Sequence, residues 1–213
     1  MTAFFFKEIP PFRMRGFRPV RDVFDNLRNV LHLVEIMNTC GHCKTGGYDA
    51  GFDIAVFSGR YNRALVRKTD GFFSMAIPFQ IVDHGNTVSY NYDFIGEAVD
   101  GQFISIMKNA LVTYRDGGAS HEDIVISLAE SFDLEVGDAI LYFDAFVALL
   151  ADDHGYFRFD DDPHNENAQF HPRYHFDFFF KNTSAVKIGS DDLVDIECFY
   201  ALFDHTYPKR YLK

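Results

Sequence analysis

The sequence predicts an α+β fold in which a mainly antiparallel sheet is flanked by helices, in a single domain over residues 1–213. Apolar residues recur at helical spacing in some segments and alternate with period two in others, in the order helix, strands, helices, strands, helix. With 47% hydrophobic residues, and with 25 Phe and 11 Tyr, the chain is able to bury a sizeable core. No linker or internal repeat divides it.

The first predicted helix covers residues 20–37, where apolar side chains recur every three or four positions. Residues 1–19 precede it as an extended basic arm. A glycine-rich loop follows over residues 39–51 and holds Cys40 and Cys43 in CxxC spacing. A structural zinc site needs a second pair of ligands, so we expect two reduced thiols in an ordinary loop, with a redox dithiol as the alternative.

The remaining elements are predicted from the same two patterns, helical spacing and period-two alternation of apolar residues. Three strands rich in β-branched and aromatic residues are predicted over 52–59, 71–83 and 87–95. Helical spacing then returns over 102–115, 120–132 and 137–152. The end of the chain is predicted to form strands over 155–162, 173–181 and 185–189, and a last helix that begins at Ser190.

Residues 120–160 resemble part of a winged helix, with a capped helix, a second helix and a β-wing. A DNA-binding domain of this kind needs cations on the second helix and the wing, but no Lys or Arg lies between Arg115 and Arg158. The chain as a whole carries 31 Asp and Glu against 20 Lys and Arg, a net charge of −11 that repels phosphate backbones. We therefore do not expect nucleic acid as a partner.

The first thirty residues differ in charge from the rest, with six cations against three acids. Arg13, Arg15 and Arg18 are interleaved with Phe12 and Phe17, a pattern that suits an acidic protein surface or stacked bases. The alternative is an arm that wraps the acidic domain of its own chain. These three arginines are the candidate partner-binding residues.

Polar residues near the end of the chain are the candidate catalytic residues. On one predicted strand His175 and Asp177 share a face, and on the strand before it Arg158 and Asp160 share a face. If the two strands pair antiparallel, the four side chains form one cluster, in surroundings that phenylalanines, Phe170 among them, keep partly dry. Such a cluster is either a salt-bridge network that pins two strands or a site where His175 acts as general base or metal ligand.

No cofactor is the first expectation, and a divalent metal is the alternative. His171, on the loop between the two strands, would then join His175 and Asp160 as a metal ligand. A nuclease of the PD-(D/E)xK type would use Asp160 and Asp177 with Lys187, although the local spacing does not match that motif.

The C-terminal part also carries a series of short motifs: an Arg-x-Asp strand over 157–163, an HP-x-x-H strand over 171–178 and a closing helix over 193–208. In this series the chain resembles an uncharacterised bacterial family of unknown function, whose members look like parts of mobile or defence gene clusters. The resemblance covers residues 155–210 and implies no reaction. It implies that the family's polar positions fall on Arg158, Asp160, His171 and His175.

From these observations we expect a non-catalytic protein-interaction or accessory protein of a bacterial or phage-related system, of the defence or mobile-element kind. Its aromatic and acidic surface would bind another protein. The alternative is a metal-dependent hydrolase, a phosphodiesterase or a nuclease, centred on the Asp/His cluster, so whether the chain is an enzyme stays open here. No apolar run reaches the roughly 18 residues of a membrane span. The three cysteines form no disulfide framework, which suits a cytoplasmic location.

Overall fold

A computed structural model of the chain describes residues 1–117, 120–152, 155–167, 169–178 and 187–209. Seven strands form one antiparallel sheet: β1 (Thr2–Phe6), β2 (Ile54–Ser58), β3 (Arg63–Lys68), β4 (Gly71–Ala76), β8 (Phe157–Asp161), β9 (Tyr174–Asp177) and β10 (Ile188–Ser190). They lie side by side in chain order, so each strand pairs with the previous one. The long segment between β4 and β8 is therefore an insertion into a continuous antiparallel sheet.

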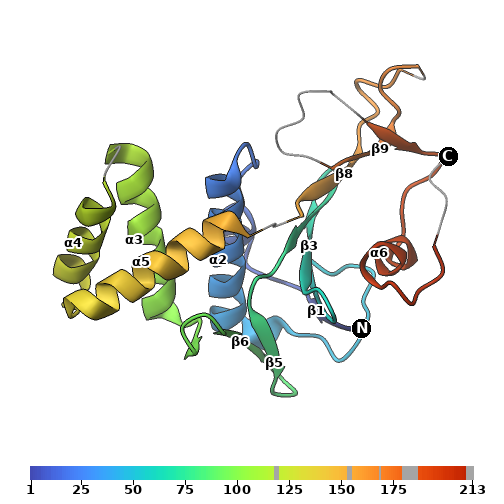
Figure 1. Ribbon diagram of the computed structural model, residues 1–213. Helices are drawn as coiled ribbons and strands as arrows, with labels where there is room; N and C mark the ends of the chain where they lie inside the picture. The colour runs from blue at the N-terminus through green and yellow to red at the C-terminus, as the bar shows by residue number, and fades with distance from the viewer. Residues whose placement is uncertain (118–119, 153–154, 168, 179–186, 210–213) are drawn as a thin grey trace.

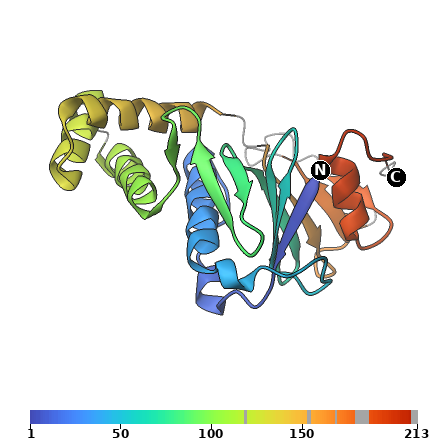
Figure 2. The same cartoon turned by 90° about the horizontal axis from the view of Figure 1, so that it is seen from below.

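That insertion forms a small sheet and a group of helices. The small sheet consists of β5 (Gln80–Asp83), β6 (Val88–Tyr92) and β7 (Glu97–Ala98). The helices are α3 (Gly101–Gly117), α4 (His121–Phe132) and α5 (Val136–Ala151). Figure 2 shows these three helices gathered at one end of the molecule. The other helical segments are α1 (Pro11–Met14), α2 (Val23–Thr39), the 3-10 turn η1 (Gly41–Cys43) and α6 (Ile196–Phe203).

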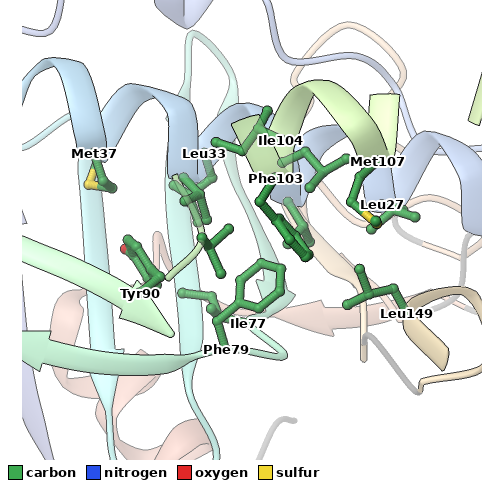
Figure 3. Packing of buried hydrophobic residues seen from close by; sticks show 14 of the residues in the cluster. Leu27, Leu33, Met37, Ile77, Phe79, Tyr90, Phe103, Ile104, Met107 and Leu149 are labelled. Carbon is green, nitrogen blue, oxygen red and sulfur yellow. The ribbon is translucent and has the colours of Figure 1, made fainter. Parts of the chain in front are cut away.

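The large sheet separates two hydrophobic cores, because successive side chains on a strand point to opposite faces. In β1, Phe4 and Phe6 belong to the core that α2 covers, whereas Phe5 belongs to the core that α6 covers. Figure 1 shows the two helices on opposite sides of the sheet. The core on the α2 side continues into the insertion, where Phe79 and Phe103 pack edge to face at 6.1 Å between ring centroids (Figure 3). The α+β class predicted from the sequence is confirmed.

Helix α2 begins and packs as its sequence requires. The carboxylate of Asp22 accepts a hydrogen bond from the backbone N–H of Asp25 at 2.8 Å and caps the first turn. Leu27, Val30 and Leu31 recur at helical spacing and are fully buried. The predicted helix over 20–37 thus corresponds to α2, shifted by two or three residues at each end.

The N-terminal arm differs from the expectation. Residues 1–19 were predicted to be extended and outside the fold, but Thr2–Phe6 form edge strand β1 and pair with β2. Three consecutive phenylalanines are buried there, because both faces of the sheet are covered at this point. Strand β3 was not predicted at all, since its charged ends conceal a short buried centre of Ala64, Leu65 and Val66.

The winged-helix expectation for residues 120–160 is wrong. Two of its helices are present as α4 and α5, and Ser120 and Asp123 form the predicted capping box. The strand expected as a free wing is β8, which lies inside the large sheet between β4 and β9. Its Phe157 and Phe159 are buried in the core under α6, which explains why the segment cannot stand apart as a wing.

Three further expectations concern the last helix, the ends of the C-terminal strands and the two cysteines of the glycine-rich loop. The last helix begins at Ile196 instead of Ser190, and Asp195 caps it by accepting from the N–H of Cys198 at 2.9 Å. The predicted strand ends over 179–181 and 185–186 lie outside the described residues. Cys40 and Cys43 are buried free thiols, and burial raises the pKa of Cys43.

Within the described ranges, no helix combines the length and the apolar character needed to cross a bilayer.

The turn between β3 and β4 provides a test of the sheet next to the candidate site. Gly71 has a φ of +140°, and a Cβ built on it would lie 2.0 Å from the carbonyl oxygen of Phe159 in β8. We expect Gly71→Ala to lower the free energy of unfolding by at least about 2 kcal/mol, because both the backbone and the neighbouring strand would have to move.

Gly46→Ala is the matched control, since a Cβ at Gly46 would meet nothing within 4 Å. It should change stability by less than about 0.5 kcal/mol. Urea unfolding of both variants measures the difference. Equal stability of the two variants would contradict the close contact between the β3–β4 turn and β8.

Candidate functional site

The antiparallel register of β8 and β9 brings the four candidate catalytic residues together. Arg158 stands opposite Asp177, and Asp160 stands opposite His175. Residues two apart share a face, so all four side chains lie on the same side of the sheet. Arg158 also stands opposite Phe73 of β4, which belongs to the core on the α2 side. The convergence of these four residues, which the sequence predicts, is therefore confirmed, on the face of the sheet that α2 partly covers.

His175 is the most deeply buried member, with 1% of its surface exposed. Its Nδ1 lies 2.8 Å from the carbonyl oxygen of Pro172. A carbonyl only accepts, so Nδ1 carries the proton and donates it. Nε2 lies 2.8 Å from the ammonium of Lys187, which only donates, so Nε2 holds a lone pair; Asp160 Oδ2 and Asp177 Oδ2 lie 3.8 and 3.9 Å from it. The backbone contact of the first ring nitrogen thus aims the second one at the two carboxylates.

Two cations join the carboxylates. Arg158 donates from Nε and Nη2 to Asp177 Oδ2 at 2.9 and 2.6 Å, and its Nε lies 2.9 Å from Asp160 Oδ2. Lys187 donates to His175 Nε2 at 2.8 Å and to Asp177 Oδ1 at 3.2 Å. We use the term polar cluster for these five residues, Arg158, Asp160, His175, Asp177 and Lys187.

Lys68 extends the network from β3. Its ammonium lies 3.1 Å from Asp160 Oδ1 and 3.2 Å from Asp70 Oδ1. The sequence indicates Lys187 only as the lysine of a nuclease motif, and it does not indicate Lys68. The position of Lys68 was hidden because β3 was not predicted, and no motif marks it.

The surroundings of Asp177 and Arg158 favour the ionised form of both side chains. Burial raises the pKa of the Asp177 carboxyl, but the hydrogen bond and charge of Arg158, together with Lys187, outweigh burial and hold that pKa below its ordinary value. Burial lowers the pKa of Arg158, and the two carboxylates outweigh this effect and raise it. Burial also raises the pKa of neighbouring Tyr156 to about 12, so its hydroxyl stays neutral at physiological pH.

A cavity of about 920 Å³ lies beside the polar cluster. Asp177, Arg158 and Lys187 line it, whereas Asp160 and His175 do not. The N-terminal segment before α2 also lines the cavity, with Arg15, Arg18 and Arg21 among its lining residues. The cluster is thus buried at its centre and reaches open space on one side, as a group that acts on a ligand must.

Several predicted site residues lie elsewhere. His171 packs edge to face on His175 with 4.7 Å between ring centroids, but its Nε2 is 3.5 Å from Asp162. Within the described residues, the group with metal-ligating geometry is Asp160, His175 and Asp177, and His171 is not part of it. Phe170 was expected to dry the cluster, but it is 79% exposed and this expectation is wrong. The side chain of Arg13 lies 3.9 Å from Glu35.

Comparison with protein-family models, with curated proteins and with solved structures finds no match for this chain. The resemblance to an uncharacterised bacterial family therefore stays a prediction, and the geometry of the site is the basis for a functional assignment.

The ion pairs of Asp177 with Arg158 and Lys187 should contribute to the free energy of unfolding. Asp177→Asn would leave Arg158 and Lys187 with a weakened partner in a largely buried position. We expect a loss of about 1–3 kcal/mol at pH 7. Because the folded-state pKa of Asp177 is lowered, its contribution is fully present above the ordinary pKa of about 4 and disappears as the pH falls through the folded value. The difference between wild type and variant should therefore shrink below about pH 4.

Asp161→Asn is the control. Asp161 of β8 pairs at 2.8 Å with Arg173, which directly precedes β9, in an exposed position, and such a pair contributes less than about 1 kcal/mol. Chemical unfolding between pH 3 and pH 7 compares the two variants. If both lose the same small amount at every pH, the cluster adds nothing to stability beyond an ordinary surface pair.

Proposed function

We propose that the protein is a divalent-metal-dependent hydrolase of phosphate esters, with its metal site at Asp160, His175 and Asp177. One observation carries the proposal: an imidazole lone pair and two carboxylates converge, with ligand atoms within 4.8 Å of one another, beside a large cavity. Imidazole and carboxylate together suit ions such as Mn²⁺, Zn²⁺ and Mg²⁺. The carbonyl of Pro172 supports the proposal further, because ligating histidines usually donate their other N–H to such a partner.

The position of Lys187 supports a cation site at the same place. Its ammonium is held by His175 Nε2 and by both oxygens of Asp177, at 2.8 to 3.3 Å. Two of the three proposed metal ligands, His175 and Asp177, therefore already bind a cation, the ammonium of Lys187. A divalent ion would displace the ammonium, and Lys187 would then be free to bind a substrate oxygen from the side of the cavity.

The remaining residues suit phosphoryl chemistry. In hydrolysis a water oxygen bonds to phosphorus, the bond from phosphorus to the leaving oxygen breaks, and the leaving oxygen takes up a proton. A divalent ion in such a site lowers the pKa of water and polarises a phosphoryl oxygen. Arg158 and Lys187 line the cavity and would neutralise the negative charge that develops on the phosphoryl oxygens.

The interaction role expected from the sequence stays a prediction. Of the three arginines assigned to a protein partner, Arg15 and Arg18 line the cavity and Arg13 lies beside Glu35. The structure adds no observation in favour of a protein partner, so we place the hydrolase first.

Metal binding is tested by thermal unfolding of wild type, Asp160→Asn, His175→Ala and His171→Ala with and without Mn²⁺. An ion at about 100 times its Kd stabilises the folded state by about 2.7 kcal/mol. We expect wild type and His171→Ala to gain about 5 °C or more, and the other two variants to gain less than about 1 °C. A response lost in His171→Ala would move the site to His171, and no response of wild type to Mn²⁺, Mg²⁺ or Zn²⁺ would overturn the metal proposal.

Hydrolysis is measured in the same samples with bis(p-nitrophenyl) phosphate as substrate. We expect Mn²⁺-dependent activity that falls at least about 100-fold in His175→Ala and Lys187→Met. His171→Ala should keep its activity within about threefold, because it leaves the three proposed ligands and Lys187 in place. Activity that survives in His175→Ala would contradict the assignment of this centre.

A further inference from the structure

Three arginine side chains of the N-terminal segment line the cavity beside the polar cluster. Arg15, Arg18 and Arg21 are exposed, and among the described residues none of them makes an ion pair with a carboxylate. Unpaired guanidinium groups that face a cavity favour an anionic ligand, and phosphate above all, because their donors match its oxygens.

The backbone of this segment is fixed, although these three side chains make no ion pair within the part of the chain that the structure describes. Asn29 of α2 accepts from the N–H of Arg18 at 2.9 Å and donates to the carbonyl of Arg18 at 2.8 Å. Asp25 accepts from the N–H of Arg21 at 3.1 Å. His32 Nε2 donates to the carbonyl of Arg13 at 2.8 Å. The backbone that carries the arginines is therefore held beside the cavity before any ligand binds, which reduces the entropic cost of ordering this segment on binding.

The part of the wall that comes from the sheet adds to the positive charge. Lys68, Arg158 and Lys187 line the cavity from the sheet, against the three carboxylates that line it, Asp53, Asp70 and Asp177. Arg67 is also in the wall, but its guanidinium donates to the carbonyls of Ala50 and Phe52 and stacks on Phe52 and Phe72 in the other core. Even without Arg67, and with Asp160, which pairs with Lys68 and Arg158, added to the three lining acids, six cations stand against four acids, a local excess of positive charge on a chain of net charge −11.

One part of the cavity is aromatic. Phe17, Phe73 and Tyr156 line it, with 5.4 Å between the ring centroids of Phe17 and Phe73 and 6.3 Å between those of Phe73 and Tyr156. Such rings offer a surface on which a nucleobase can stack. The volume of about 920 Å³ is in the range of pockets that hold one drug-sized ligand.

We infer that the cavity binds a nucleotide with two or more phosphates, whose phosphates lie between the arginines of the N-terminal segment and the polar cluster and whose base lies against the aromatic wall. The inference deepens the proposed function by naming its substrate class, and it rests on that function for turnover but not for binding. A long polynucleotide is disfavoured because the acidic remainder of the chain would repel its backbone.

The test is calorimetric titration with ATP, in EDTA and about 150 mM salt, of wild type and two double variants. Arg15→Ala with Arg18→Ala removes two cations of the cavity and keeps the backbone hydrogen bonds to Asn29. Arg28→Ala with Arg60→Ala removes the same charge from residues that do not line the cavity. We expect at least about a tenfold loss of ATP affinity in the first double variant and less than about a twofold loss in the second.

Two further ligands complete the test. Pyrophosphate should bind at least about tenfold more weakly than ATP, because it leaves the aromatic wall unused. A 20-nucleotide single-stranded DNA should bind more weakly than ATP at this salt. Absent ATP binding, equal losses in both double variants, equal affinity for pyrophosphate or tighter binding of DNA would each overturn the inference. Because EDTA removes divalent ions, failure of the proposed metal chemistry leaves these outcomes unchanged, and the two failures are distinguishable.

Discussion

The antiparallel register between β8 and β9 is the constraint on which the site depends. A slip by one residue would turn each side chain of β9 to the other face, and His175 and Asp177 would enter the aromatic core under α6. Phe159 and Phe176 stand opposite each other in that core, with 5.0 Å between ring centroids, and oppose such a slip. Packing of the phenylalanines under α6 thus fixes the register of the two strands. That register places the four polar side chains on the face toward α2.

Charge balance explains why the polar face is stable within the sheet. Two largely buried carboxylates without partners would be costly, and here Arg158, Lys187 and Lys68 surround them. His175 fits between these charges because its Nδ1–H donates to a backbone carbonyl and its Nε2 accepts from Lys187. The same arrangement serves the proposed function, since the cations that stabilise the free protein also line the cavity and are able to bind a phosphoryl group.

Much of the fold follows from the sequence where the periodicity is clear. The helix before residue 40, the helices of the insertion and the pairing of Arg158 and Asp160 with His175 and Asp177 all follow from spacing. Strands β1 and β3 were not predicted, because the three consecutive phenylalanines of β1 and the charged ends of β3 do not form a period-two pattern. The cavity was also not predictable, since it needs the N-terminal arginines and the C-terminal strands side by side, a contact between distant parts of the chain.

The central claim is that His175 directs an unprotonated Nε2 at two carboxylates, and the tautomer of the ring tests it most directly. Long-range proton–nitrogen NMR spectra of histidine-labelled protein at pH 7, assigned by comparison with His175→Ala, report which nitrogen of each imidazole carries a proton. The account predicts for His175 a protonated Nδ1 and an unprotonated Nε2. A proton on Nε2 would remove the lone pair from the cluster and contradict both the hydrogen bond from Lys187 and the proposed metal site.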